Sequence, residues 1–290
     1  MELLLQTMLS GAVIGASYAL VAVGLTIVFG IGKVVNFAHG EFFMAAGYGV
    51  VIGLALGLPY GVAVLFALLL VAVLGLVVEK VIIARGLYEA DEHVSIIVTF
   101  ALALGMTNVA QLLAGSNSIA TRSSLTAVRL SVGDVGIDGQ RAITAVAAVL
   151  VLTGLVLWLR RTRTGMQLRA VSDNPLGALY SGINVRRIRT LAFVLGVVLA
   201  GVAGALLAPV LTVYPTMGQT AVVTAFTVVV LGGLGSVGGA ALAGFLVGVG
   251  YAFVATYVSV DWTTGVGWLL VIVMLLARPR GLLGAKQMRV

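Results

Sequence analysis

The feature that most constrains this chain is a series of apolar runs, each close to the length that crosses a lipid bilayer. A transmembrane helix needs about 20 predominantly apolar residues. Nine such runs follow one another along the chain: 4–31, 42–58, 61–84, 94–114, 142–159, 190–211, 220–234, 237–258 and 264–277. Because 61% of the residues are apolar and only 9% are charged, against about 25% charged in a soluble domain, we expect an integral membrane protein.

The expected fold is an all-α, polytopic bundle of about 8–9 transmembrane helices that forms a single domain over residues 1–290. The run 220–234 is short and leads into GGLGSVGG, so it either crosses the membrane or re-enters as a half-helix. Irregular backbone at membrane depth is stable only where it is buried in protein or lines a cavity. We therefore expect broken or re-entrant glycine-rich segments, with the pieces 30–49 and 232–250 as candidates for a pair of internal repeats.

Small residues recur at every fourth position in three of the expected helices. The sets are Ala45, Gly49, Gly53 and Gly57; Gly196, Ala200 and Gly204; and Gly232, Ser236, Ala240, Gly244, Gly248 and Ala252. On a helix this spacing makes a smooth stripe that a neighbouring helix can approach closely. The stripes predict a compact bundle with several tight helix crossings.

The distribution of Lys and Arg predicts the orientation, because cytoplasmic loops carry an excess of both. If the basic loop 160–189 is inside, 14 of the 17 Lys and Arg residues are cytoplasmic, and the opposite orientation leaves 3 inside. The external loop 115–141, where we expect a small hairpin, holds the other three. The chain starts MELLLQTML, without the basic n-region of a secretory signal. We expect a retained first span, an external N-terminus and a cytoplasmic C-terminus.

Several kinds of chemistry are missing from the sequence. There is no cysteine, no G-x-x-x-x-G-K-[ST] phosphate-binding loop, no H-E-x-x-H and no G-x-S-x-G, and there are two histidines. We therefore expect no metal, no bound nucleotide and no enzyme activity in this chain. The net charge of +7 is explained by the basic loops rather than by a nucleic-acid partner.

Polar residues cluster in the segment NFAHGE at 36–41. Asn36, His39 and Glu41 would be costly in lipid unless they face protein or water. One interpretation is a gate or hinge near the cytoplasmic mouth, with Gly40 as a flexible point. A second is a helix N-terminus that Asn36 caps, with Glu41 near its positive end. A proton relay through His39 and Glu41 is a third.

Two further groups are candidates for moving or contacting parts. Gly232, Gly233 and Gly235 in the glycine-rich turn are additional gate or hinge candidates. Asn108 and Gln111 lie three residues apart and share a helix face, so they either line a pathway or bond to another helix. The adjacent Glu79 and Lys80 are expected to extend to the inner membrane interface.

The loop 160–189 contains the pattern of two short helices. An earlier helix is expected over Met166–Ser172, with Arg169 on it. Asn174 and Pro175 are typical of a helix start, residues 176–181 follow as a short helix, and Gly182 is typical of a helix end. A basic amphipathic loop can rest on lipid headgroups, but the second helix is small and uncharged, which favours insertion into a groove of another protein.

Four stretches together resemble one family. NFAHGE at 36–41, RTGMQLRAVSDNPLGALYSGINVRRIR at 163–189, AFVLGVVLAGVAGAL at 192–206 and the glycine-rich stretch 229–248 are similar to the LivH-type permeases of branched-chain amino acid ABC importers. The resemblance covers nearly the whole chain. It implies a permease that moves branched-chain amino acids, or related amino acids and amides, across the membrane.

The resemblance also implies an assembly. A second homologous permease, two ABC ATPase subunits and a soluble substrate-binding protein are the expected partners, and ATP and Mg²⁺ would bind to the ATPases. The loop 160–189 would then couple the permease to an ATPase through Arg169, Asp173, Asn174, Pro175, Ala178 and Gly182. The alternative is a stand-alone, ion-coupled secondary transporter. It is less favoured because no Asp lies within the apolar runs.

Overall fold

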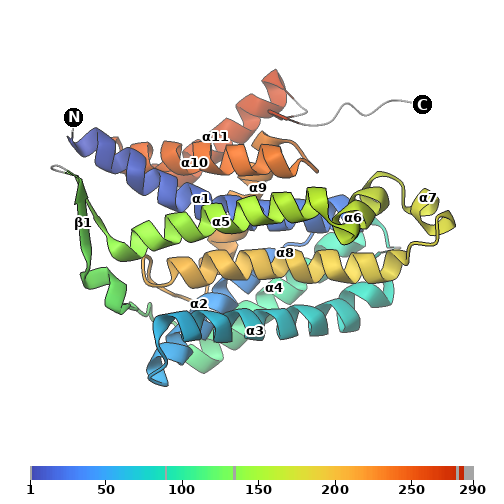
Figure 1. Ribbon diagram of the computed structural model, residues 1–290, viewed down its shortest axis with the longest axis horizontal. Helices are drawn as coiled ribbons and strands as arrows, with labels where there is room; N and C mark the ends of the chain where they lie inside the picture. The colour runs from blue at the N-terminus through green and yellow to red at the C-terminus, as the bar shows by residue number, and fades with distance from the viewer. Residues whose placement is uncertain (1, 89, 133–134, 279–280, 284–290) are drawn as a thin grey trace.

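The computed structural model describes residues 2–88, 90–132, 135–278 and 281–283, and these form a helical bundle with one short β-hairpin (Figure 1). The first half contains the helices α1 (Glu2–Gly32), α2 (His39–Ala55), α3 (Tyr60–Val78), the π-helix η1 (Glu79–Leu87), α4 (Glu92–Ala114) and the 3₁₀ turn η2 (Ser124–Ala127). The second half contains α5 (Gly139–Arg161), α6 (Arg163–Asp173), α7 (Pro175–Tyr180), α8 (Val185–Leu207), α9 (Met217–Gly232), α10 (Val237–Tyr257) and α11 (Trp262–Ala277).

The hairpin and the two short helices α6 and α7 lie at opposite ends of the bundle. Strands β1 (Arg129–Val132) and β2 (Val135–Asp138) pair antiparallel, with Arg129 opposite Asp138. They lie at the end where α1 begins, whereas α6 and α7 project from the other end, and α1, α3, α5 and α8 run between the two (Figure 1). The hairpin expected within 115–141 is confirmed.

Length and composition make this a multi-pass membrane fold. Six helices of the described residues are long and apolar enough to cross a bilayer: Glu2–Gly32, Tyr60–Leu87, His93–Ala114, Gly139–Arg161, Val185–Leu207 and Val237–Tyr257. The second of these combines α3 with η1. Helices α2, α9 and α11 are also apolar but shorter, with 17, 16 and 16 residues. Each of the nine apolar runs therefore corresponds to a helix.

The core of the bundle is built around α1, which packs against α10 on one side and α8 on another. A Cβ added at Gly244 of α10 would lie 2.6 Å from Cα of Ala19, and one at Gly11 of α1 would lie 2.7 Å from Cα of Val249. Side chains do not fit there, so the backbones approach closely and gain dispersion contacts along their length. The tight crossing expected from the stripe of small residues that includes Gly244 and Gly248 is therefore confirmed.

The stripe on α2 serves the same purpose against α3. A Cβ added at either Gly49 or Gly53 would lie 2.8 Å from the Cβ of Ala67 or Ala63 respectively. The shorter stripe on α8 presents Gly204 to the backbone of Phe43 in α2. Three helices are thereby packed closely through small residues rather than through large interlocking side chains.

Two segments of the chain have the same order of elements and meet each other. In each, a long helix (α1 or α8) is followed by a non-helical link (33–38 or 208–216) and a shorter helix (α2 or α9). The long helices cross where Gly24 meets Gly196, and the short helices begin side by side where Gly40 meets Gly218. The segments α1–α2 and α8–α9 thus share an element order and are in contact, while the candidate pair 30–49 and 232–250 stays a prediction.

Candidate functional site

The helix α7 is defined at both ends by local hydrogen bonds. Asn174 Oδ1 accepts from the backbone N–H of Gly177 at 2.9 Å, and Pro175 occupies the first helical position. At the other end Gly182 has φ +78°, and the N–H of Ile183 donates to the carbonyl of Ala178 at 3.0 Å. This is the Schellman arrangement, in which a left-handed glycine closes the helix. The expected helix start and end are confirmed.

The two faces of α7 differ sharply. Ala178 is 4% exposed and packs toward the bundle, whereas Leu176, Leu179 and Tyr180 are 65%, 55% and 87% exposed. The helix carries no charged residue and lies at one end of the molecule (Figure 1), and its two leucines and its tyrosine form a small exposed apolar surface. The sequence analysis selected Ala178 and missed these three side chains. Their spacing places them on one helix face, but an apolar face at this spacing usually points into a core, so the sequence gives no signal that this face is exposed.

The helix α6 attaches α7 to the bundle. Ser172 Oγ donates to the carbonyl of Gly30 at the end of α1, at 3.1 Å. Arg169 Nη1 donates to the carbonyl of Leu159 near the end of α5. Asp173, the last residue of α6, is exposed. Helix α6 is thereby hydrogen-bonded to the ends of both α1 and α5.

A buried carboxylate joins the end of α3 to the start of α8. Glu79 is fully buried, and its Oε1 accepts from the hydroxyl groups of Thr190 at 2.8 Å and Tyr88 at 3.3 Å. The guanidinium of Arg189 lies over the Tyr88 ring, 5.0 Å from its centroid. The expectation that Glu79 extends to the membrane interface is wrong, because the hydroxyl groups of Tyr88, directly after η1, and of Thr190 in α8 bind its carboxylate in the interior of the protein. The neighbouring Lys80 is exposed.

The segment NFAHGE lies where α2 and α9 begin, beside the middle of α1. His39 is fully buried, and its Nε2 is 3.0 Å from the carbonyl oxygen of Val21. Asn36 Oδ1 accepts from the N–H of Ala38 at 3.1 Å, so it orders the link before α2, while the N-cap residue is Ala38. The segment is therefore inside the bundle rather than at its cytoplasmic mouth, because the link 33–38 runs back along α1.

This junction of α2 and α9 contains polar atoms that have no hydrogen-bond partner among the described residues. They are Asn36 Nδ2, His39 Nδ1, both carboxylate oxygens of Glu41, and the hydroxyl of Thr107 in α4. The Glu41 carboxylate lies against Gly218, where an added Cβ would be 2.6 Å from Oε2. Gly40 and Gly218 thus permit two helix starts to approach closely around a buried carboxylate.

The other glycine candidates lie elsewhere. Gly232 ends α9, about 21 Å from Gly218 for a helix of this length. Gly233 and Gly235 have φ of 102° and 84°, which only glycine adopts readily. The N–H of Leu282 donates to the carbonyl of Leu231 at 2.8 Å, so a later segment rests on this turn. The structure does not bring the two sets of gate candidates together.

The polar pair on α4 faces outward. Asn108 is exposed, and its Nδ2 donates to the carbonyl of Leu104 in the same helix at 2.7 Å. Gln111, one turn further on, is half-buried. Asn108 therefore satisfies its amide within α4 and does not bond to another helix of this chain. Among the described residues, no group of three or more His, Asp or Glu side chains is placed to hold a metal ion.

Six helices long and apolar enough to cross a bilayer, with one short helix exposed at the end of the bundle, are typical of a multi-pass membrane protein. Residues 7–277 match the family described as "Branched-chain amino acid transport system / permease component", and the chain belongs to this family. It is 32% identical to the high-affinity branched-chain amino acid transport system permease protein LivH of Escherichia coli K12 over 97% of this chain and 95% of that protein. It is 33% identical to the corresponding BraD protein of Pseudomonas aeruginosa, with the same coverage.

A solved structure supports the fold. PsaBC from Streptococcus pneumoniae, in complex with Fab, aligns with a TM-score of 0.51 over 96% of this chain and 92% of that chain. The sequences are 18% identical, so this likeness concerns the arrangement of helices alone.

Proposed function

We propose that this chain is the membrane-spanning permease subunit of an ATP-driven ABC importer of branched-chain amino acids, or of related amino acids and amides. The observation that carries the proposal is the match of residues 7–277 to the branched-chain amino acid permease family, together with relatives of that description over nearly the whole chain. The permease itself is not an enzyme. It provides the path, and other subunits hydrolyse ATP.

The proposed assembly contains a second homologous permease, two ABC ATPase subunits and a soluble substrate-binding protein. ATP and Mg²⁺ bind to the ATPases, and the binding protein delivers substrate to the external end. This division of roles is supported by spans rich in small and apolar residues, which suit a weakly binding pathway, and by the sequence's lack of a phosphate-binding loop.

We assign coupling to α6 and α7. The apolar side chains of α7 would insert into a groove of the ATPase, with Asn174, Pro175 and Gly182 defining the helix and Asp173 and Arg169 at its base. Closure of the ATPases would pull α7. The hydrogen bonds of Ser172 to α1 and Arg169 to α5, and of Thr190 to Glu79, would pass the movement to the long helices.

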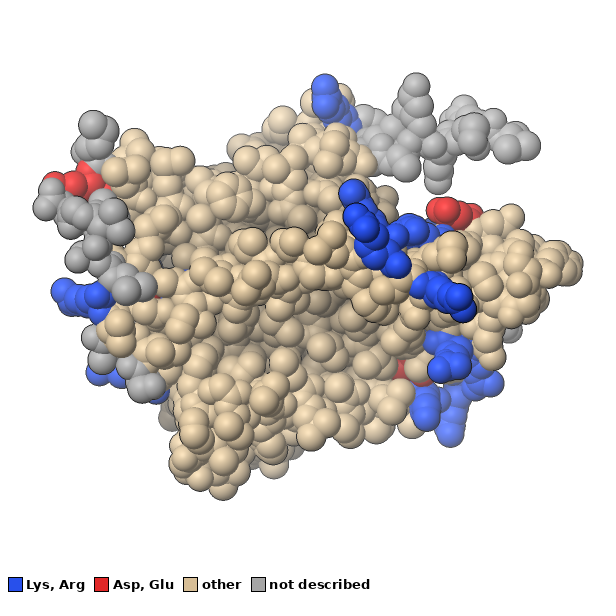
Figure 2. Space-filling view, in the orientation of Figure 1, with Lys and Arg blue, Asp and Glu red and all other residues tan. Residues whose placement is uncertain are grey.

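We further propose nine membrane crossings in one domain, with the N-terminus outside and the C-terminus in the cytoplasm of a bacterial cell. Two of the nine crossings are broken, which means that a non-helical link covers part of the membrane and a short helix covers the rest. They consist of link 33–38 with α2 and of link 208–216 with α9. Figure 2 supports the orientation, since Lys and Arg gather at the α6–α7 end. Arg280, Lys286 and Arg289, which contribute to the same argument, lie outside the described residues.

The gate is proposed at the junction of α2 and α9, where Asn36, His39, Gly40 and Glu41 meet the start of α9. Two close-packed helix starts can separate or rotate without crossing a barrier of interlocked side chains, because Gly40 and Gly218 present none. The turn with Gly232, Gly233 and Gly235 would act as a hinge at the cytoplasmic end. Asn108 and Gln111 on the outer face of α4 would line a path shared with the second permease.

Reconstitution tests the function directly. Proteoliposomes that contain both permeases and the ATPases are supplied with the binding protein on the opposite side of the membrane from the ATPases. They are expected to take up labelled leucine only when ATP is present on the side of the membrane where the ATPases lie. Uptake should persist with a proton uncoupler at constant ATP. Leucine uptake by this chain alone that collapses with the uncoupler would instead establish the ion-coupled secondary transporter.

The role of α7 is tested by a matched pair of variants. Leu179→Ser/Tyr180→Ser removes exposed apolar surface, and each lost anchor of an interface costs about 2 kcal/mol or more. We expect the ATPase to dissociate from the purified complex while the permease keeps its thermal stability. Leu65→Ser/Leu69→Ser, which alters two exposed leucines of α3, is the control and should retain the ATPase.

A further inference from the structure

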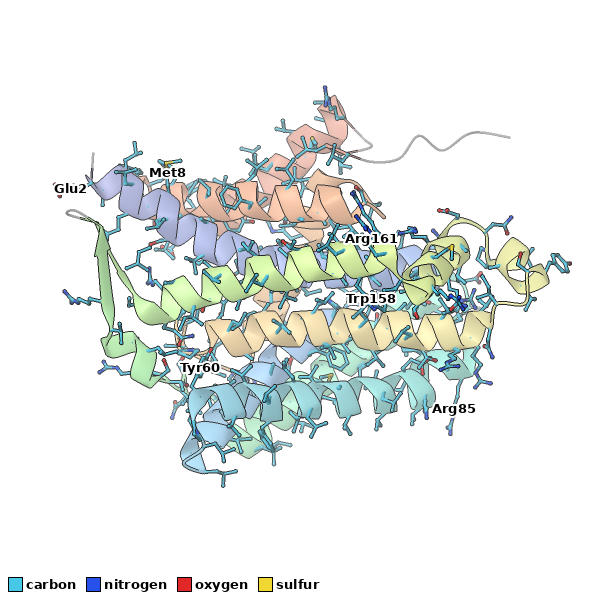
Figure 3. All side chains as sticks on the ribbon, viewed as in Figure 1. Glu2, Met8, Tyr60, Arg85, Trp158 and Arg161 are labelled. Atoms are coloured by element: carbon cyan, nitrogen blue, oxygen red, sulfur yellow. The ribbon has the colours of Figure 1, made fainter. Side chains whose placement is uncertain are left out.

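A groove opens between α5 and α8 beside α6, with a volume of about 910 Å³. Trp158 of α5 lies on one side of it (Figure 3). Leu191 and Val194 of α8 form the other wall, and Leu76 of α3 closes the lower side. The three spans that border the groove are all apolar enough to cross a membrane, and Gly182, Ile183 and Asn184 in the link before α8 complete its lining.

The lining is sorted by polarity. Arg163 and Gln167 of α6 and Arg187 at the start of α8 lie at the mouth, whereas Leu76 and Val194 lie further along the spans. No acidic residue lines the groove, and within the described part of the chain neither arginine forms an ion pair. Two acidic groups lie on the neighbouring elements: Glu79, which is buried and accepts a hydrogen bond from the lining residue Thr190, and Asp173, which is exposed at the end of α6.

The length over which the groove changes from polar to apolar matches the boundary between the headgroups and the hydrocarbon of a lipid bilayer. From Arg187 to Val194 the helix rises about 10 Å, and over this rise the lining changes from cationic to apolar. Tryptophan is typical of this boundary, because its ring is amphipathic. A small soluble anion would use only the mouth of the groove, and an apolar segment of a protein would leave both arginines without a partner. An amphiphile satisfies both parts.

We propose that this groove binds an anionic glycerophospholipid. Its phosphate lies between Arg163 and Arg187, and one acyl chain runs along Leu191 and Val194 toward Leu76. Basic pockets between spans on the cytoplasmic side are suited to such headgroups. The site lies directly beside α6, so a bound lipid would support the base of the segment that carries α7.

The test measures lipid binding to the full-length chain in detergent by native mass spectrometry. Phosphatidylglycerol and phosphatidylcholine are titrated in parallel, and phosphatidylglycerol is expected to bind more tightly. Arg163→Gln/Arg187→Gln should weaken phosphatidylglycerol binding by about 30-fold, since each basic residue near an anionic headgroup contributes roughly a fivefold effect and the two effects multiply. The control is Arg160→Gln/Arg161→Gln, which removes the same charge at the same end of the molecule but outside the groove. It should bind phosphatidylglycerol as tightly as the unmodified chain does.

Two further arms address the apolar part and the source of the phosphate. Val194→Trp fills the deep end of the groove and is expected to weaken phosphatidylglycerol binding, while glycerol phosphate should not displace the lipid. The proposal is overturned if phosphatidylglycerol and phosphatidylcholine bind equally, or if the Arg160/Arg161 control loses as much phosphatidylglycerol binding as the Arg163/Arg187 variant. It is also overturned if glycerol phosphate displaces the lipid, or if the bound lipid is lost when the ATPase subunits bind over the groove. None of these readings depends on transport, so they leave the proposed function untouched.

Discussion

At the scale of single residues, Gly182 and Glu79 determine the local geometry near α7. Gly182 adopts φ +78° and ends α7, so the direction in which the chain leaves α7 depends on one left-handed residue. Glu79 of η1 accepts a part-buried hydrogen bond from Thr190 of α8, and Glu79 Oε2 has no partner among the described residues. A change at either position alters geometry near α7 without touching its exposed face.

Replacing Gly182 with Val is expected to uncouple transport. A β-branched residue in the left-handed region is strained by roughly 1–2 kcal/mol, so the last turn of α7 should rearrange. Leucine uptake should fall at least tenfold in proteoliposomes while ATP hydrolysis continues. Gly182→Asn is the control, because Asn tolerates this region, and it should retain most of the uptake. Equal uptake by the Val and Asn variants would show that the end of α7 does not matter.

Replacing Thr190 with Val is expected to destabilise the permease. The substitution keeps the shape but removes a hydroxyl donor from the buried Glu79 carboxylate, at a cost of about 1–3 kcal/mol. Thermal unfolding in detergent should show a lower midpoint for Thr190→Val, whereas Thr190→Ser, which keeps the hydroxyl, should unfold near the unmodified chain. If Val and Ser unfold together, the hydroxyl contributes nothing measurable.

At the scale of secondary-structure elements, glycine spacing sets which helices are neighbours. Between apolar helices in lipid there is no hydrophobic gain on association, so the available contact area decides the pairing. Helix α10 uses Gly244 and Gly248 against α1, and α2 uses Gly49 and Gly53 against α3. The junction of α2 and α9 follows the same rule at Gly40 and Gly218, with the difference that a carboxylate is enclosed there.

This contact rule gives a matched prediction within α10. Gly244→Val would drive a side chain into Ala19 of α1, whereas an added Cβ at Gly250 meets nothing within 4 Å. We expect Gly244→Val to give little folded protein after membrane extraction, by size-exclusion chromatography, and Gly250→Val to give a normal yield. A normal profile for both would mean that α1 and α10 are not packed as closely as described.

At the scale of the whole molecule, polarity divides the permease into two ends. The hairpin end is fastened by Arg141, which pairs with Asp138 at 3.3 Å and donates to Ser10 Oγ at 3.1 Å. The α6–α7 end holds most of the cationic side chains seen in Figure 2. A separation of this kind orients the protein in its membrane, because positively charged loops are retained on the cytoplasmic side.

The cysteine-free sequence allows this orientation to be measured. Ser118→Cys lies in the loop 115–141, and Ser181→Cys lies at the end of α7; both positions are exposed. A membrane-impermeant maleimide added to intact cells with a permeable outer envelope should label Ser118→Cys and not Ser181→Cys. Lysed membranes should label both. The reverse pattern in intact cells would invert the proposed topology.

Local patterns were sufficient for much of this protein. The number and order of apolar helices follow from runs of apolar residues, and the start and end of α7 follow from Asn174, Pro175 and Gly182, whose effects act within one or two turns. The family, too, could be identified from NFAHGE and the segment 163–189. These features need no knowledge of which helices are neighbours.

Tertiary packing decided the rest. A helix that is apolar on all sides has no amphipathic pattern to show which face is buried, so the inward turn of Ala178 and the burial of Glu79 were not visible in the sequence. The meeting of α2 with α9, and the distance between Gly40 and Gly232, depend on links that run back into the bundle. Contacts between residues more than a hundred positions apart set these arrangements, and in an apolar solvent they are selected by shape rather than by polarity.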